Sequence, residues 1–88
     1  MGAMQNLNSI GTGTNTTFGA FHPTTRYVSF DVQDNDVYVS YDDTPPSSTH
    51  GHILYAGNSY TWDKFTAEAA TFNSVGGTAQ IAASEFTD

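Results

Sequence analysis

The stretch Arg26-Tyr27-Val28-Ser29-Phe30-Asp31-Val32 sets the fold class of this 88-residue chain. Apolar and polar side chains alternate through it, which is the period of a β-strand with one face in a core. The same alternation returns at residues 37–41, and the four residues between the two runs are Gln, Asp, Asn and Asp. Asp and Asn tolerate the left-handed backbone of tight turns. The two runs are therefore predicted to form a β-hairpin.

More short strands follow the hairpin, separated by turn and loop residues. Residues 42–51 contain two consecutive prolines, which cannot lie inside a sheet. Residues 65–70 are the only stretch with helix propensity, and they are too few for an independent helix. The remaining strands are predicted at residues 52–56, 59–63, around Ala70 and Phe72, and at 78–85.

Short strands at this spacing are typical of an antiparallel sandwich or a small barrel. The chain is therefore predicted to be all-β: a small antiparallel β-sandwich or barrel over residues 26–88, preceded by an extended N-terminal arm. The predicted core consists of the inward apolar side chains of the strands, namely Val28, Phe30, Val32, Val37, Val39, Tyr41, Leu54, Tyr60, Trp62, Phe72 and Ile81. The last strand is expected to turn Ala79, Ile81 and Ala83 inward.

The arm is predicted at residues 5–25, which are rich in Gly, Thr and Asn. Its few large apolar residues are Leu7, Ile10, Phe18 and Phe21, too few to form a core alone. We expect the arm either to lie across its own domain or to be donated to a neighbouring subunit. Residues 1–4 are interpreted as a cloning remnant and are left out of the fold prediction.

The composition excludes several classes of partner. The net charge is −7 with only two Lys or Arg residues. Binding to nucleic acid or to anionic lipid needs clustered cations, so neither partner is expected. No apolar run approaches the roughly 18 residues of a membrane-spanning helix, and we expect no signal peptide. The chain has no Cys, which suits assembly in a reducing cytoplasm.

Two clusters of polar residues invite a metal interpretation. His50 and His52 are two residues apart, so a strand there would turn both imidazoles to one side. The alternative is that both lie in solvent or at a subunit contact. Asp34, Asn35 and Asp36 invite a calcium interpretation, but they lack the ligand spacing of an EF-hand and are interpreted as turn formers. We predict neither a metal nor another cofactor.

Catalytic motifs are not found in the sequence. The chain lacks a Cys nucleophile, a Gly-x-Ser-x-Gly elbow and a phosphate-binding Gly-x-x-x-x-Gly-Lys loop. Glu68 and Glu85 form a conceivable pair of carboxylates, but nothing in the sequence brings them to a cleft. We therefore predict a protein that is not an enzyme, with no catalytic residues.

Several aromatic residues are candidates for an interface. Tyr27, Tyr38 and Tyr55 fall on or near the face opposite the core series, and Phe18 and Phe21 belong to the arm. Tyr is enriched at protein interfaces. Burial of both faces of the sheet, or a platform for stacking sugars, are the alternatives for the tyrosines.

Four segments resemble a pattern in small virion proteins of tailed bacteriophages: residues 26–32, 36–42, 51–62 and 78–85. In those proteins an Arg opens a strand, a "VYV" arm follows, a "G-x-x-L-x-x-G-x-S-Y" segment comes next, and an apolar strand ends in Glu. The corresponding residues here are Arg26, Val37-Tyr38-Val39, the run from Gly51 to Tyr60, and Glu85. The double-proline loop and the arm lie outside the resemblance.

The resemblance implies a β-sandwich that decorates or cements a capsid, or that sits in the tail or a fibre, often as a trimer. The expected function is that of a capsid decoration protein, a homotrimer in contact with the major capsid protein or another virion protein. Its expected location is the virion, after assembly in the host cytoplasm. An ion pair between Arg26 and Glu85 is expected from the same pattern. The alternative is a receptor- or carbohydrate-binding module of a tail fibre or secreted protein.

Overall fold

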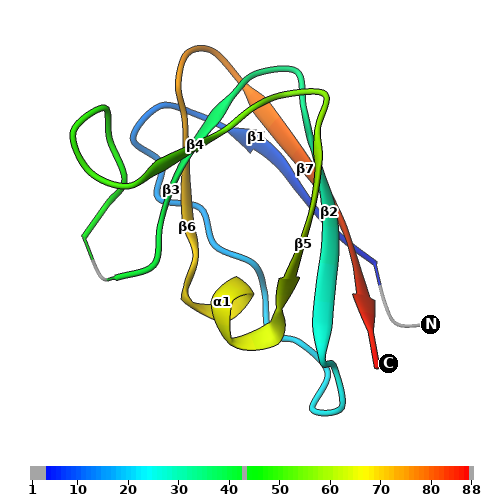
Figure 1. Ribbon diagram of the computed structural model, residues 1–88. Helices are drawn as coiled ribbons and strands as arrows, with labels where there is room; N and C mark the ends of the chain where they lie inside the picture. The colour runs from blue at the N-terminus through cyan, green and yellow to red at the C-terminus, as the bar shows by residue number, and fades with distance from the viewer. Residues whose placement is uncertain (1–3, 43, 88) are drawn as a thin grey trace.

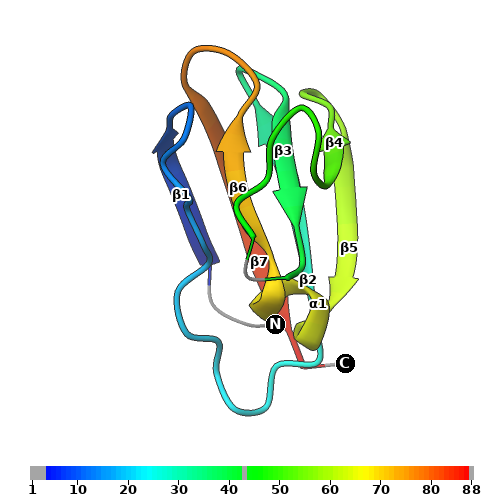
Figure 2. The ribbon, with the colours of Figure 1, turned by 90° about the vertical axis from the view of Figure 1, so that its left-hand side faces the viewer.

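The computed structural model describes residues 4–42 and 44–87, so the cloning remnant expected at residues 1–4 lies outside it except for Met4. Two antiparallel sheets pack face to face and enclose the core (Figure 1). Figure 2, turned by 90°, shows the smaller sheet in front of the larger one. The predicted all-β sandwich is confirmed.

The larger sheet has four strands in the order β1-β7-β2-β5. Their bounds are Met4–Ile10 for β1, Tyr27–Gln33 for β2, Ser59–Asp63 for β5 and Ala79–Phe86 for β7. Alternation along β2 and β7 turns every second side chain into the core, as the sequence predicted. Ala79, Ile81 and Ala83 are all buried.

The smaller sheet has three strands in the order β4-β3-β6. These are Val37–Ser40 for β3, His52–Leu54 for β4 and Thr71–Ser74 for β6. One short helix, α1 (Lys64–Ala69), carries the chain from β5 in one sheet to β6 in the other. The helix buries Ala67 and forms at the stretch that had helix propensity.

The hairpin predicted for residues 26–41 is wrong. β2 pairs with β5 and β7, whereas β3 pairs with β4 and β6, so the two strands belong to different sheets. The intervening turn crosses from one layer to the other, with Asp34 at φ 74°. The Asp/Asn-rich turn was identified correctly, because Asp34 does adopt the left-handed backbone there. Their pattern does not distinguish a hairpin from a crossing between layers.

Residues 4–25 lie across their own domain, one of the two alternatives for the arm. β1 pairs antiparallel with β7 and forms the edge of the larger sheet. The chain then returns beside β6, where Thr16 and Phe72 exchange backbone hydrogen bonds of 2.9 and 2.7 Å. Phe18 and Phe21 follow and enter the core. Residues on both sides of the expected boundary at residue 25 therefore pack in the same core.

Aromatic rings dominate the centre of the core. Phe72 lies 5.3 Å from Phe18, and Phe30 lies 4.7 Å from Trp62, both edge to face. Ten of the eleven predicted core residues are buried or packed against the core. Tyr41 is the exception, 40% exposed, because β3 ends one residue before it. The core residues that were missed include Ile10, Phe18, Phe21, Ala67 and Ala70.

Two buried polar side chains fasten the irregular segments to the sheets. On β7, the Glu85 carboxylate accepts hydrogen bonds from the His22 backbone N–H (3.0 Å), the Thr25 hydroxyl (2.8 Å) and the Gln5 amide (3.2 Å). On β6, Asn73 bonds to the turn at residue 15 and to the loop at Pro46, its Nδ2 lying 3.1 Å from the Pro46 carbonyl. Each sheet therefore has one buried polar side chain that is hydrogen-bonded to a non-strand segment. We call these two side chains, Glu85 and Asn73, the buried ties.

Candidate functional site

The outer face of the larger sheet is mostly polar. Ser29 lies opposite Thr61 and Asp31 lies opposite Ser59. The Ser59 hydroxyl donates to the Asp31 carboxylate at 2.5 Å, and the hydroxyls of Thr61 and Ser29 lie 3.4 Å apart. Hydroxyls, amides and a carboxylate on this face are well solvated.

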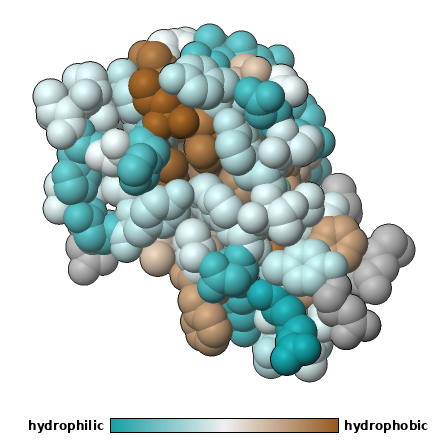
Figure 3. Space-filling model, in the orientation of Figure 1, coloured by the Kyte–Doolittle hydropathy of each residue, from teal (hydrophilic) through white to brown (hydrophobic). Residues whose placement is uncertain are grey.

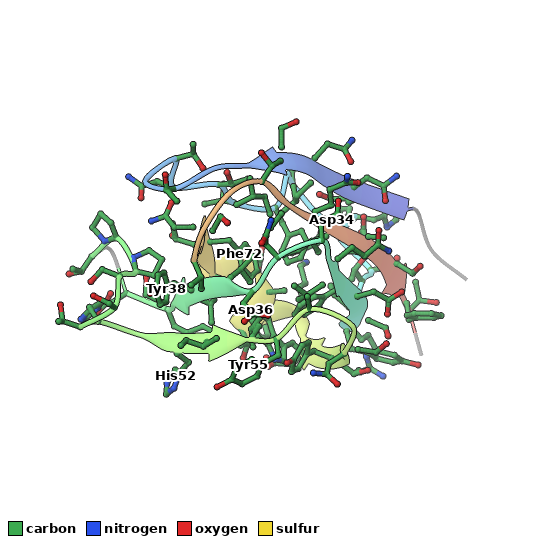
Figure 4. All side chains as sticks on the ribbon, turned by 90° about the horizontal axis from the view of Figure 1, so that it is seen from above. Asp34, Asp36, Tyr38, His52, Tyr55 and Phe72 are labelled. Atoms are coloured by element: carbon green, nitrogen blue, oxygen red, sulfur yellow. The ribbon has the colours of Figure 1, made fainter. Side chains whose placement is uncertain are left out.

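The outer side of the smaller sheet carries several apolar side chains, beside the buried amide of Asn73 opposite Tyr38. Tyr38 on β3 lies directly opposite Ile53 on β4, and Val75 follows β6 on the same side. Ile53 is 42% exposed, Val75 40% and Tyr55, just beyond β4, 55%. We call Tyr38, Ile53, Tyr55 and Val75 the apolar face. Figure 3 shows a narrow hydrophobic patch at the upper left, surrounded by more polar surface, and Figure 4 shows Tyr55 beside His52 at the free edge of β4.

A shallow hollow of about 250 Å³ lies on the apolar face. Tyr38 and Val75 line it, together with the turn at residues 12–13 and the loop at residues 46–48. None of the lining residues carries a charge. An uncharged hollow beside exposed Tyr and Ile side chains suits an apolar side chain from a protein partner.

The loop between β3 and β4 is held by its own hydrogen bonds. Ser40 Oγ donates to the Thr44 carbonyl at 2.7 Å, and Ser47 and His50 exchange backbone hydrogen bonds of 2.9 and 3.3 Å. Gly51 has φ +104°, and a Cβ there would lie 2.3 Å from the Val39 carbonyl oxygen. Only glycine fits this position, so the path of the backbone into β4 depends on Gly51.

A second hollow, of about 370 Å³, lies at the base of this loop between Tyr41, Asp42, His50 and His52. His50 Nε2 lies 3.0 Å from Asp42 Oδ1. The hydrogen bond with His50, and a second one from the Thr44 backbone N–H, lower the pKa of Asp42. Burial raises the pKa of the Tyr41 hydroxyl, since its ring packs edge-on against Trp62 at 5.4 Å.

The two histidines singled out in the sequence do not converge on one point with further ligands. His50 is engaged with Asp42, whereas His52 lies against the Tyr41 ring at 6.1 Å. Within residues 4–42 and 44–87, no group of three or more His, Asp or Glu side chains is placed to hold a metal ion. Of the two adjacent acids in this loop, Asp43 lies outside the described residues.

The five residues predicted for an interface fall in three different places. Phe18 and Phe21 are buried in the chain's own core, which replaces the expectation that they contact a neighbour. Tyr27 lies on the outer face of the larger sheet, stacked on Phe86 at 5.2 Å. Tyr38 and Tyr55 belong to the apolar face. Sequence reasoning missed Ile53 and Val75, although Ile53 alternates with the buried Leu54 and so had to face outward.

The expected ion pair between Arg26 and Glu85 is not formed among the described residues. Glu85 is buried, and its three donors are the Gln5 amide, the His22 N–H and the Thr25 hydroxyl. Burial favours the neutral acid, but these hydrogen bonds outweigh it, so the pKa of Glu85 lies below its ordinary value. The Arg26 side chain is exposed at the end of the sheet.

Comparison of the chain with protein-family models, with curated proteins and with solved structures finds no match. In the part of the chain that the structure describes, no helix has the length and apolar character needed to cross a membrane.

Proposed function

We propose that this chain is a non-enzymatic structural protein of a bacteriophage virion, a capsid decoration protein that acts through protein–protein contacts. The single observation that carries the proposal is the apolar face: the half-buried Tyr38 and the exposed Ile53 on one sheet, with the exposed Tyr55 and Val75 just beyond its strands, while the outer face of the other sheet is mostly polar. Contiguous exposed apolar surface marks an interaction site in a small soluble domain. The resemblance of residues 26–85 to small phage virion proteins supplies the class of partner.

Charge supports docking through this face. The chain has a net charge of −7, yet the hollow between Tyr38 and Val75 has no charged lining residue. A partner side chain can therefore fill this hollow without desolvating a charge, which would oppose association. The expected partner is the major capsid protein, and the expected location of the protein is the outside of the head.

The test is co-sedimentation of the purified full chain with empty shells assembled from the major capsid protein of the same phage. Saturable binding at a fixed number of copies per capsid subunit is expected. Shells that sediment without the chain, under conditions where both remain folded, would contradict the proposal.

A second candidate function is a receptor- or carbohydrate-binding module, favoured by the hollow between Tyr41, Asp42, His50 and His52. An exposed aromatic ring beside a carboxylate and imidazoles is suited to stack on a sugar and bond its hydroxyls. Glycan-array binding that is lost in Tyr41→Ala, with no binding to shells, would favour this function. Shell binding that Tyr41→Ala leaves unchanged would favour the first.

A further inference from the structure

The chain has one Arg, Arg26, and one Lys, Lys64, and both line the same hollow. This hollow lies at the lower end of the molecule in Figure 1, near α1. The Lys64 N–H donates to the Arg26 carbonyl at 2.9 Å, so the two residues face each other just beyond the β2–β5 ladder. With Phe65 and residues 23–25 they line a hollow of about 390 Å³. None of these lining residues is acidic, although Asp63 and Glu68 flank Lys64 and Phe65 in the sequence and the buried Glu85 accepts a hydrogen bond from Thr25. We call this hollow the cationic end.

An uncovered aromatic side chain belongs to the cationic end. Phe65 is 76% exposed, the largest value among the exposed large hydrophobic residues. One exposed Phe needs no explanation by itself. Beside the only two Lys or Arg residues of a chain with net charge −7, however, it forms a site that suits a surface both acidic and apolar.

The opposite end of the same molecule has that composition. Three turns meet at the upper end in Figure 1, at residues 33–36, 55–58 and 75–78. They are tied together: Asn35 Nδ2 donates to the Thr78 carbonyl at 2.6 Å, and the Ala56 N–H donates to Asp36 at 2.8 Å.

Asp34 and Asp36 lie at this end, which we call the acidic end, and neither Lys nor Arg does. The exposed side chains of Tyr55 and Val75 border it. Figure 4 looks down on this end and shows Asp34, Asp36 and Tyr55 there. The acidic end therefore complements the cationic end in charge and in apolar contact. A second copy bound there covers Tyr55 and Val75 at the margin of the apolar face and leaves Tyr38 and Ile53 for the shell.

We propose that the cationic end of one copy binds the acidic end of the next, head to tail. The proposal rests on the proposed function, because it names the contact through which copies assemble on a shell. A head-to-tail contact either closes into a ring or continues as a filament. The trimer that the resemblance implies is the closed form with three copies.

The proposed contact is small, so the test must cover high protein concentrations. The molecule measures 34 × 25 × 17 Å, so either end buries less than the roughly 800 Å² per partner of a stable interface. We therefore expect weak, concentration-dependent association in solution, strengthened on a shell because neighbouring copies are held close together.

The experiment measures the mass of the full chain by sedimentation and light scattering over a range of concentrations. The cationic end is neutralised in Arg26→Gln/Lys64→Gln, and the acidic end in Asp34→Asn/Asp36→Asn, where Asn keeps the hydrogen-bond acceptors of both turns. Each double variant is expected to associate about tenfold or more weakly than the wild type. The acidic-end variant is the more telling, since its lower net charge would otherwise favour association.

Mixing the two variants identifies a head-to-tail contact directly. Each variant keeps one intact end, so the mixture is expected to form dimers and nothing larger. The matched control Asn6→Asp/Thr61→Glu adds the same two negative units as the cationic-end variant, at exposed positions on β1 and β5, and is expected to associate like the wild type. Phe65→Ser tests the apolar part without any change of charge and is expected to weaken association.

A wild-type chain that stays monomeric at millimolar concentration would overturn the proposal. So would association that survives either end variant, that is lost equally in the control, or that mixing does not restore. Shell co-sedimentation of the same variants separates the two proposals. End variants that bind shells with the same affinity and cooperativity as the wild type would leave the decoration function intact and remove the head-to-tail contact. Loss of shell binding in the cationic-end variant alone would instead make an acidic patch on the shell the occupant of that end.

Discussion

The two sheets are alike on their inner faces and different on their outer ones. Phe30 from the larger sheet and Phe72 from the smaller sheet meet in one aromatic core, with ring centres 6.2 Å apart. Outside, the larger sheet presents hydroxyls and a carboxylate, whereas the smaller sheet presents Tyr38 and Ile53. Folding needs only the inner faces to be apolar. The apolar outer face of one sheet alone therefore indicates a role in association.

The largest expected effect is on stability, and it tests whether the inner faces of the two sheets share one core. Phe30→Ala and Phe72→Ala should each lower the free energy of unfolding by about 3–5 kcal/mol, because each leaves a cavity among packed rings. Urea denaturation followed by Trp62 fluorescence measures it. The exposed Phe65→Ala is the control and should change stability by less than about 0.5 kcal/mol. A loss below about 1 kcal/mol at either core position would show that the two sheets do not share one core.

The next effect tests the difference between the outer faces. Tyr38→Thr/Ile53→Thr keeps side chains suited to strands but removes most of the apolar face. Binding to shells should weaken by about 30-fold or more, the effect of losing about 2 kcal/mol at the centre of an interface. Ser29→Ala/Thr61→Ala on the larger sheet is the matched control and should leave binding unchanged. Equal losses in both variants would remove the distinction between the two faces.

A smaller effect distinguishes the two buried ties. Glu85→Gln should lower stability by about 1–2 kcal/mol at neutral pH, because a charged acceptor of three hydrogen bonds becomes neutral. The folded-state pKa of Glu85 is lowered, so its contribution is present above the unfolded value of about 4.3 and is lost as the pH falls from there through the folded pKa.

Denaturation at a series of pH values measures this contribution, and Glu85→Gln should lose less stability on acidification than the wild type does. Asn73→Ala is the comparison on the smaller sheet, because Asn73 does not titrate. Its cost should be the same at every pH. Identical acid sensitivity of Glu85→Gln and the wild type would contradict the assignment.

The smallest effect concerns two surface carboxylates at the ends of β3 and β5. The pKa of Asp42 is lowered first by its hydrogen bond with His50, and that of Asp63 first by the Thr66 hydroxyl. In a carboxyl NMR titration, His50→Ala should raise the pKa of Asp42 and leave that of Asp63 unchanged. Thr66→Val should do the reverse. Each variant serves as the control for the other, and a shift of both carboxylates together would mean that neither contact is specific.

The sequence predicted which strand residues face the core better than it predicted which strands pair. Period 2 identified Val28, Phe30, Val37 and Val39 as inward, and all four are buried. The same pattern contains no information about hydrogen-bond partners. The crossing at residues 33–36 was therefore mistaken for a hairpin, since an Asp/Asn-rich turn serves both connections.

The candidate site was predicted only in part, for the same physical reason. Tyr38 and Tyr55 were identified because they alternate with core residues. Phe18 and Phe21 were placed at an interface because the Gly/Thr-rich segment around them has no periodicity to show which way they point. The packing of that segment between the sheets buries them, with Phe18 against Phe30 and Phe72. The cationic end depends on the pairing of β2 with β5, which sequence patterns do not specify.

The most direct test of the difference between the outer faces is hydroxyl-radical footprinting of the chain, free and bound to shells. Oxidation of Tyr38, Ile53 and Tyr55 should fall on binding, whereas oxidation of the Tyr27–Phe86 pair on the other sheet should stay the same. Protection of Tyr27 and Phe86, with Tyr38 and Ile53 oxidised as in the free chain, would contradict the account.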